Sequence, residues 1–248
     1  MNLKAKLDSL VRAKNTTAGL FDAPDPLQVA KIQGDEFACL ICALFAYGNA
    51  GNIVNFLKKL DFFLVNSSEN AIIKNTAHLK YRFQSPADIA QIFITLKRLK
   101  NESSLENIFL QGYEKDESIV SALRVFIAKA RKINAYASLG YDFFFGVPFL
   151  GEPKGTMKRY NMFLRWVVRA DELDLGLWSG IDTAHLLMPL DTHTHKVALK
   201  LGLMRRKSYD FKAVLELTKN LREFDAKDPI KYDFALYRLG QSKEYLDL

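Results

Sequence analysis

Apolar positions recur at helical spacing along most of the chain, and no segment sustains the alternation typical of strands. The first such pattern covers residues 2–14 and comprises Leu3, Leu7, Leu10 and Val11. The same periodicity predicts further helices over residues 86–101, 105–113, 118–133, 156–169, 195–203, 210–224 and 228–246. The pattern therefore predicts an all-α protein.

Residues 34–64 open with acidic side chains and continue as a segment that is apolar on every side, which is typical of a buried central helix. We expect Gly48 and Gly51 to separate it from a second helix. Cys39 and Cys42 form a C-x-x-C pattern within the buried segment, with no second cysteine pair. We interpret them as small core residues rather than as redox or metal-binding groups.

Residues 136–155 are rich in aromatic residues, glycine and proline, and we interpret them as a long ordered connection. A chain of 248 residues with 49% hydrophobic content can bury one core, so we expect one domain over residues 1–248. A division into two lobes with a cleft between them is also consistent with the pattern. One lobe would hold the early helices of residues 25–135, and the other would hold the terminal segments and residues 150–248.

The 35 basic and 28 acidic residues give a net charge of +7. This balance favours a nucleic acid over a membrane as partner, although many basic enzymes share it. The longest apolar run, residues 37–47, is too short to cross a bilayer, and two cysteines provide no disulfide framework. We therefore expect a cytoplasmic protein, and we expect it to be a monomer.

The candidate chemistry is concentrated in residues 154–203, which hold both tryptophans and most of the histidines. On a helix over residues 156–169, Lys158, Arg165 and Arg169 share one face. One interpretation is a solvated or ion-paired face. The other is a surface that contacts phosphates, with free backbone N–H groups at the start of the helix nearby.

Asp191 precedes a predicted helix and is a preferred residue for its N-cap. Together with His193 and His195 it also forms a D-x-H-x-H pattern that offers metal ligands. On a helix, however, the two imidazoles diverge, so we expect no metal site at this position.

Two segments resemble motifs of the helix-hairpin-helix DNA glycosylases related to endonuclease III. PLDTHTHKVALKLGL, residues 189–203, resembles their V-D-T-H-x-x-R-V-A-x-R-L-G-L segment, and KRYNMFL from Lys158 resembles their K-T-A-N-x-x-L. Residues 37–60 are similar to an early pair of helices of these enzymes, and residues 234–241 are similar to a late helix. KRYNMFLRWVVR, DLGLW, PLDTHT and DPIKYDFALYRLG also resemble a bacterial family of unassigned function.

The resemblance implies a helix-hairpin-helix glycosylase-like bundle that removes damaged bases from duplex DNA and cleaves the abasic site. It implies that Lys158 attacks the sugar and that Asp191 assists. An amine becomes a nucleophile when burial and nearby cations, here Arg159 and Arg165, favour its neutral form. The candidate DNA contacts are Lys154, Gly155, Thr156, Arg159, Arg165 and Arg169, and the candidates for an aromatic base pocket are Tyr47, Phe163, Trp166 and Trp178.

The chain departs from the glycosylase pattern in several ways. GVPFLGEPKGTM replaces the L-P-G-V-G hairpin, Tyr47 replaces a DNA-wedging glutamine, and the interval from Lys158 to Asp191 is longer than in endonuclease III. The four-cysteine cluster loop is missing, so we expect neither an iron–sulfur cluster nor another cofactor. Two alternatives remain: a non-catalytic DNA- or RNA-binding module, and a metal-assisted hydrolase at Asp191, His193 and His195.

Overall fold

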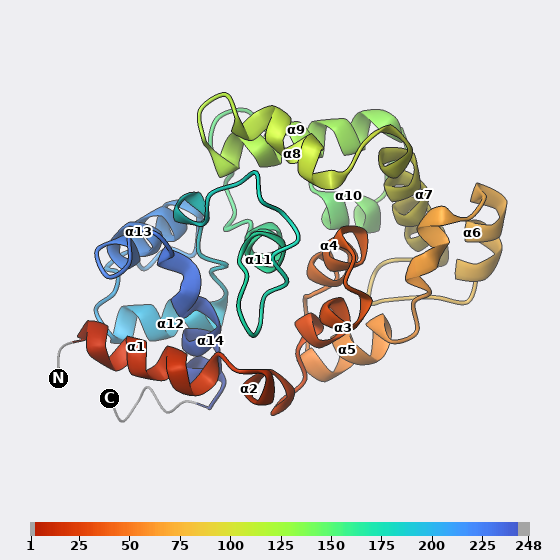
Figure 1. The fold of residues 1–248 in the computed structure, drawn as a ribbon. Helices are drawn as coiled ribbons and strands as arrows, with labels where there is room; N and C mark the ends of the chain where they lie inside the picture. The colour runs from red at the N-terminus through yellow and green to blue at the C-terminus, as the bar shows by residue number, and fades with distance from the viewer. Residues whose placement is uncertain (1–2, 243–248) are drawn as a thin grey trace.

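Helices make up the regular secondary structure of residues 3–242, which are the residues that the computed structural model describes (Figure 1). The only β-type pairing among them is two isolated bridges, so the prediction of an all-α protein is confirmed. In chain order the elements are α1 (Leu3–Lys14), α2 (Thr17–Phe21), α3 (Pro26–Gln33), α4 (Glu36–Leu44), α5 (Ala50–Leu57), η1 (Phe62–Asn66), α6 (Glu69–Thr76), α7 (Pro86–Glu102), α8 (Leu105–Tyr113), α9 (Ile119–Ile133), α10 (Leu139–Phe145), α11 (Lys158–Val168), η2 (Thr183–His185), α12 (Thr192–Lys200), α13 (Phe211–Arg222), η3 (Pro229–Tyr232) and α14 (Asp233–Ser242).

Polar caps define the ends of several predicted helices. Ser85 and Asp88 form a capping box at the start of α7, and Ser118 caps α9, as the sequence indicates. Asn2, in the first predicted helix, and residues 243–246, in the last, lie outside the described residues. Helices α1, α7, α8 and α9 otherwise confirm their predicted positions.

The prediction of a connection over residues 136–155 is partly wrong, because α10 lies within it. Ser138 caps this short helix by accepting a hydrogen bond from the backbone N–H of Tyr141. Tyr141, Phe144 and Phe145 then form a buried face at helical spacing. The helix is too short for its periodicity to stand out among the neighbouring aromatic and glycine residues.

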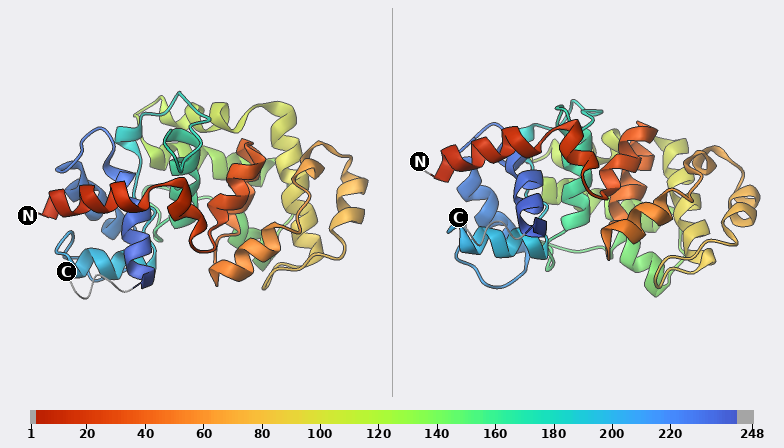
Figure 2. Two further views of the ribbon diagram at one scale, coloured as in Figure 1. Left: turned by 60° about the horizontal axis from the view of Figure 1, so that its bottom comes forward. Right: turned by 90° about the horizontal axis from the view of Figure 1, so that it is seen from below.

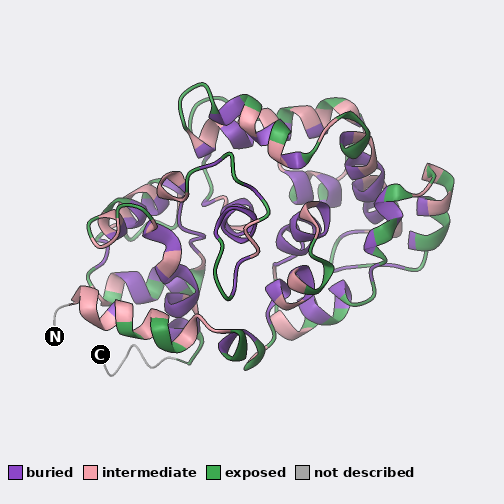
Figure 3. Cartoon of the chain, in the orientation of Figure 1, coloured by how far each residue is buried: buried purple, intermediate pink, exposed green. Residues whose placement is uncertain are grey.

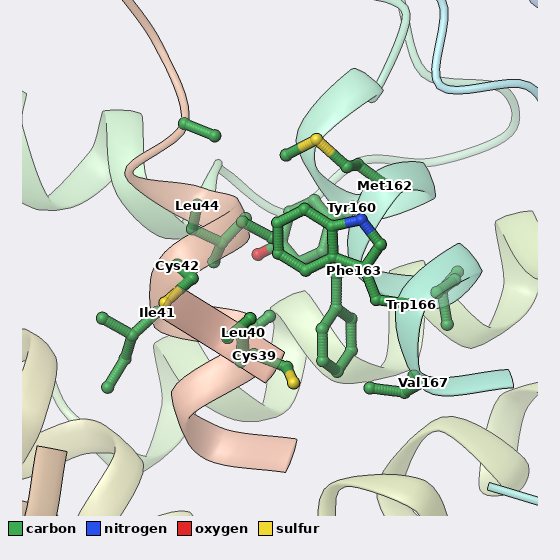
Figure 4. Packing of buried hydrophobic residues seen from close by; sticks show 14 of the residues in the cluster. Cys39, Leu40, Ile41, Cys42, Leu44, Tyr160, Met162, Phe163, Trp166 and Val167 are labelled. Carbon is green, nitrogen blue, oxygen red and sulfur yellow. The ribbon is translucent and has the colours of Figure 1, made fainter. Parts of the chain in front are cut away.

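Helix α4 lies at the centre of the hydrophobic core and packs against α11 (Figure 4). Every side chain from Phe37 to Leu44 is buried, and Cys39 and Cys42 are free thiols without exposed surface. The interpretation of these cysteines as core residues is therefore confirmed. Helix α4 ends before Gly48, where φ is +104°, while Gly51 lies inside α5 rather than at the break.

The helices form two groups with α11 between them, as the three ribbon views show (Figures 1 and 2). Helices α3 to α10 form one group, in which the main contacts join α8 to α9, α6 to α7 and α3 to α4. Helices α1, α12, α13 and α14 form the other. Helix α11 is buried along nearly its whole length (Figure 3). None of the described helices has both the length and the apolar character needed to cross a membrane.

A buried network of ion pairs fixes α11 to the second group. Arg165 pairs with Asp174 at 3.1 Å and also with Asp233 at the start of α14. Arg169 pairs with Asp228 at 2.9 Å and with Asp174. Because Asp174 has no exposed side-chain surface, its charge depends on these two guanidinium groups for stabilisation.

The segment DLGLW, residues 174–178, closes the C-terminal end of α11. The backbone N–H groups of Leu175 and Trp178 donate to carbonyl groups of Trp166 and Val167, which belong to the last turn of that helix. Gly176 has φ +60°, and a Cβ atom there would lie 2.5 Å from that of Ala170, so the tight turn requires glycine. The segment thus supplies both a charge and a cap to α11.

We predict that Asp174→Ala lowers the free energy of unfolding by about 3–5 kcal/mol, because it leaves two buried guanidinium groups without their shared partner. Urea denaturation measures this change. Lys212→Ala, an exposed residue on α13 whose side chain has no partner among the described residues, is the control and should change stability by less than about 0.5 kcal/mol. Equal effects of the two substitutions would contradict a structural role for the network.

Candidate functional site

A cavity of about 630 Å³ lies where the N-termini of four helices converge. Asp25 precedes α3, Lys158 begins α11, Asp191 precedes α12 and Asp233 begins α14, and all four side chains line the cavity. The segment between α4 and α5 also lines the cavity. A volume of this size is typical of pockets that hold small ligands or single nucleotides.

Lys158 is the first residue of α11, two residues later than the predicted start of that helix. The preceding residue, Met157, has a left-handed backbone with φ +51° and provides no side-chain cap. Lys158 is half-buried, and its amine forms no hydrogen bond or ion pair with residues 3–242. The amine is therefore available to a molecule in the cavity.

Asp191 is the N-cap of α12, which confirms its predicted structural role. One carboxylate oxygen accepts a 2.7 Å hydrogen bond from the backbone N–H of Thr194. The other oxygen receives no hydrogen bond from the described part of the chain. The cap orients the side chain while leaving acceptor capacity for a ligand, so the structural and functional interpretations are compatible.

The interior of the cavity is acidic rather than basic. Burial raises the pKa of Asp25, and it raises that of Asp233 to about 6, although nearby positive charges including Arg165 and Lys158 oppose both shifts. The positive charge of Lys158 opposes both shifts, and Asp191 contributes a third carboxyl group. The cavity therefore combines three carboxyl groups with one amine and the guanidinium of Arg165.

The basic residues predicted to share one face of α11 do not form an exposed surface. Arg165 and Arg169 are buried in the ion-pair network, so the ion-paired interpretation applies to both. Arg159 donates to the carbonyl groups of Leu44 and Phe143, and burial lowers its pKa to about 10. These arginines hold helices together.

The remaining predicted DNA contacts lie just before α11. Lys154 and Gly155 are exposed, whereas Thr156 is buried and its carbonyl accepts a hydrogen bond from the amide of Asn161. The backbone N–H groups of the first turn of α11 have no partner among the described residues. Only the exposed part of this segment can meet a partner directly.

Two of the four predicted pocket aromatics belong to the core instead. Phe163 and Trp178 pack edge to face with ring centroids 5.2 Å apart, and the indole N–H of Trp178 donates to Glu36. Trp166 and Tyr47 do line the cavity. Three further aromatic residues line it that were not among the predicted ones, Tyr209, Phe234 and Tyr237. Phe234 and Tyr237 lie in the FALYRLG motif, and this motif was the feature of the sequence that could have indicated them.

An aromatic cluster extends from the cavity to the surface. The rings of Tyr47, Phe83 and Phe143 contact one another with centroid distances of 4.7–5.5 Å, and Phe83 and Phe143 remain 41% and 39% exposed. The guanidinium groups of Arg82 and Arg159 lie 5.6 Å from the centroid of the Tyr47 ring. The cavity thus has a rim of exposed rings and positive charge.

The two histidines of the D-x-H-x-H pattern point to different neighbours. His195 is buried beside the carbonyl of Arg206, 3.2 Å away, whereas His193 is exposed and faces Tyr237. Within residues 3–242, no three histidine, cysteine or acidic side chains are grouped closely enough to hold a metal ion. The geometry does not bring the proposed metal ligands together.

Over residues 25–242 the chain matches a family described as proteins of unknown function, DUF2400. Because the match covers most of the chain, the chain belongs to this family. No curated protein and no solved structure was found to match it. The finding fits the predicted family of unassigned function, whereas the relation to helix-hairpin-helix glycosylases stays a prediction.

We predict that Asp191→Ala lowers the free energy of unfolding by about 1 kcal/mol, because α12 loses its N-cap. Asp191→Asn should have a much smaller effect, since asparagine is an equally good cap. Thermal or urea denaturation distinguishes the two. A similar loss of stability in both variants would contradict the capping role. Asp191→Asn would then be unsuitable for testing whether the carboxylate takes part in a reaction.

Proposed function

We propose that this protein is a DNA base-excision N-glycosylase on a helix-hairpin-helix glycosylase-like fold, with lyase activity through a Schiff base at Lys158. The observation that carries the proposal is the placement of Lys158 and Asp191 in one cavity, although they come from separate segments. The amine has no competing partner among the described residues, and the carboxylate is oriented by its cap. Damaged duplex DNA is the proposed substrate.

In the proposed reaction, the neutral amine of Lys158 attacks C1′ of an extrahelical nucleotide as the bond from C1′ to the base breaks. The base departs with the bonding electrons and is protonated. Positive charge develops on the sugar, and the carboxylate of Asp191 stabilises it. Loss of the amine proton and opening of the sugar ring then give an imine between Lys158 and C1′, from which the 3′ phosphate can be eliminated.

The shape and surroundings of the cavity support this proposal. Its volume of about 630 Å³ can accommodate a nucleotide, and the half-buried Tyr237 lines it. At the rim, the exposed rings of Phe83 and Phe143 are suited to stacking with bases, and Arg82 is exposed beside them. Lys154 and the first turn of α11 offer a positive side chain and free N–H groups for a phosphate.

The second candidate function is a non-catalytic DNA- or RNA-binding module. The burial of Arg165 and Arg169 favours it, because these cations are paired with carboxylates and do not act on Lys158 as unpaired charges. This candidate requires the rim and the segment before α11 to bind nucleic acid, but it requires no reaction at Lys158. Trapping and binding experiments separate the two candidates.

We predict that borohydride traps a covalent adduct between the protein and duplex DNA that carries abasic or oxidised sites. Lys158→Ala should abolish the adduct because the attacking amine is missing. Asp191→Asn should reduce its rate by about 100-fold or more, as expected for loss of one charged group that stabilises the transition state. Denaturing electrophoresis of labelled DNA measures both effects.

Lys219→Ala serves as the matched control, since it removes an exposed lysine that does not line the cavity. It should still form the adduct once DNA is saturating. If no adduct forms across a broad panel of lesions, the lyase proposal fails. DNA binding without any turnover would then favour the non-catalytic module.

We further predict that DNA affinity falls steeply with salt, because phosphate contacts release counterions. Arg82→Ala should weaken binding and reduce the slope of log K against log salt by about 1. Lys219→Ala, an exposed lysine on α13 away from the cavity, should leave the slope unchanged. Fluorescence anisotropy at several salt concentrations measures the slopes, and identical slopes for Arg82→Ala and the unmodified protein would exclude a phosphate contact at the rim.

A further inference from the structure

The positive charge of the chain is concentrated in one segment that begins at the cavity. Residues 192–212 hold six lysine and arginine residues and one aspartate, so this segment contributes +5 to the formal net charge of +7. It comprises α12, the loop that follows and the start of α13. The basic residues are Lys196, Lys200, Arg205, Arg206, Lys207 and Lys212.

The exposed face of α12 carries a row of lysines that starts beside the cavity. Thr192, Lys196 and Lys200 are exposed and follow one another at intervals of four residues, so their side chains lie on one face of the helix. Thr192 lines the cavity, and the row extends from it along α12 for about 12 Å. In both views of Figure 2, α12 lies at the edge of the second group of helices.

The loop after α12 adds a further lysine and is held against the same helix. Nε2 of His195 lies 3.2 Å from the carbonyl oxygen of Arg206, and the guanidinium of Arg206 pairs with Asp210. Lys207 follows in this loop and is exposed, and Tyr209, two residues later, lines the cavity. The loop therefore presents Lys207 from an ordered backbone. We refer to Lys196, Lys200 and Lys207 as the α12 surface.

The lysines of the α12 surface have no acidic partner in the part of the chain that the structure describes. Lys129 on α9, by contrast, pairs with Glu102 at 3.0 Å. Like charges four residues apart on a helix repel one another, and a bound polyanion removes this repulsion. The α12 surface is therefore suited to a polyanionic partner.

The side chains of α12 favour nucleic acid over an anionic membrane as that partner. A helix that binds a membrane surface buries an apolar face in the lipid. The apolar face of α12 packs against α14 inside the protein instead. The exposed residues of α12 are Thr192, His193, Lys196 and Lys200, and none of them is apolar. Lysines without an exposed apolar edge match the phosphates of a nucleic acid.

We propose that the α12 surface binds the phosphates of duplex DNA on one side of the nucleotide in the cavity. The inference rests on the proposed function for the choice of DNA and for a nucleotide in the cavity. Because each base pair of a duplex rises by roughly 3.4 Å, the row on α12 spans about four base pairs. The α12 surface thus provides exposed positive charge that Arg165 and Arg169 of α11 do not, since both are buried in ion pairs.

The salt dependence of DNA binding tests this surface without requiring catalysis. In the full chain, the double variant Lys196→Ala/Lys200→Ala should bind undamaged duplex DNA more weakly and reduce the slope of log K against log salt by about 2, because two phosphate contacts are lost. The control Lys74→Ala/Lys132→Ala removes the same charge from exposed positions of α6 and α9 and should leave the slope unchanged. All four lysines are exposed, so both variants should fold. Fluorescence anisotropy measures the slopes.

Duplexes that carry one abasic site and one shortened flank test whether the contacts lie on one side. Reducing one flank to about two base pairs should weaken binding more than reducing the other, because only one flank reaches the α12 surface. The Lys196→Ala/Lys200→Ala variant should lose this difference, whereas the control variant should retain it.

An unchanged slope in the α12 variant, an equal change in the control, or equal effects of shortening either flank would each overturn the inference. Trapping of the Schiff base with an unchanged slope would overturn it while supporting the proposed reaction. A reduced slope without any trapped adduct would instead retain the α12 surface and reject the reaction. Binding to phosphatidylserine vesicles but not to DNA, with loss of this binding in the α12 variant, would identify a membrane surface and overturn the inference.

Discussion

The pairing of two buried arginines with aspartates is the interaction on which the rest of the structure depends. Arg165 and Arg169 project from α11 toward the second group of helices, and Asp174, Asp228 and Asp233 receive them. Burying so many charges is favourable only when each has a partner, so the geometry of α11, the DLGLW segment and α14 is strongly coupled. The same coupling fixes the position of Lys158 relative to Asp233, and hence the form of the cavity.

The aspartates that line the cavity lie at helix starts. An aspartate at an N-cap is held by backbone N–H groups, so its side chain is oriented before any ligand arrives. Asp25 and Asp191 both have this property, and each retains an oxygen for other partners. Preorganised carboxylates of this kind bind donors without much loss of conformational entropy, which is an advantage for both recognition and catalysis.

Local patterns allowed the class of the fold, the central position of α4 and the cap at Asp191 to be predicted, because periodicity and capping depend on neighbours in the sequence. Other features depend on contacts between distant segments. The sequence placed Arg165 on the same face as Lys158, but the depth of Asp174 and Asp233 decides that this arginine is an internal ion-pair partner. Asp25 was missed for the same reason, since no local motif links it to Asp191.

In helix α11, the residue that begins the helix at the cavity and the residues that hold the helix in place lie at different positions. Its first residue, Lys158, faces the cavity, whereas the core contacts and the ion pairs come from the following turns. The first position of this helix can therefore change without breaking the contacts that hold the helix in place, because those contacts come from its later turns.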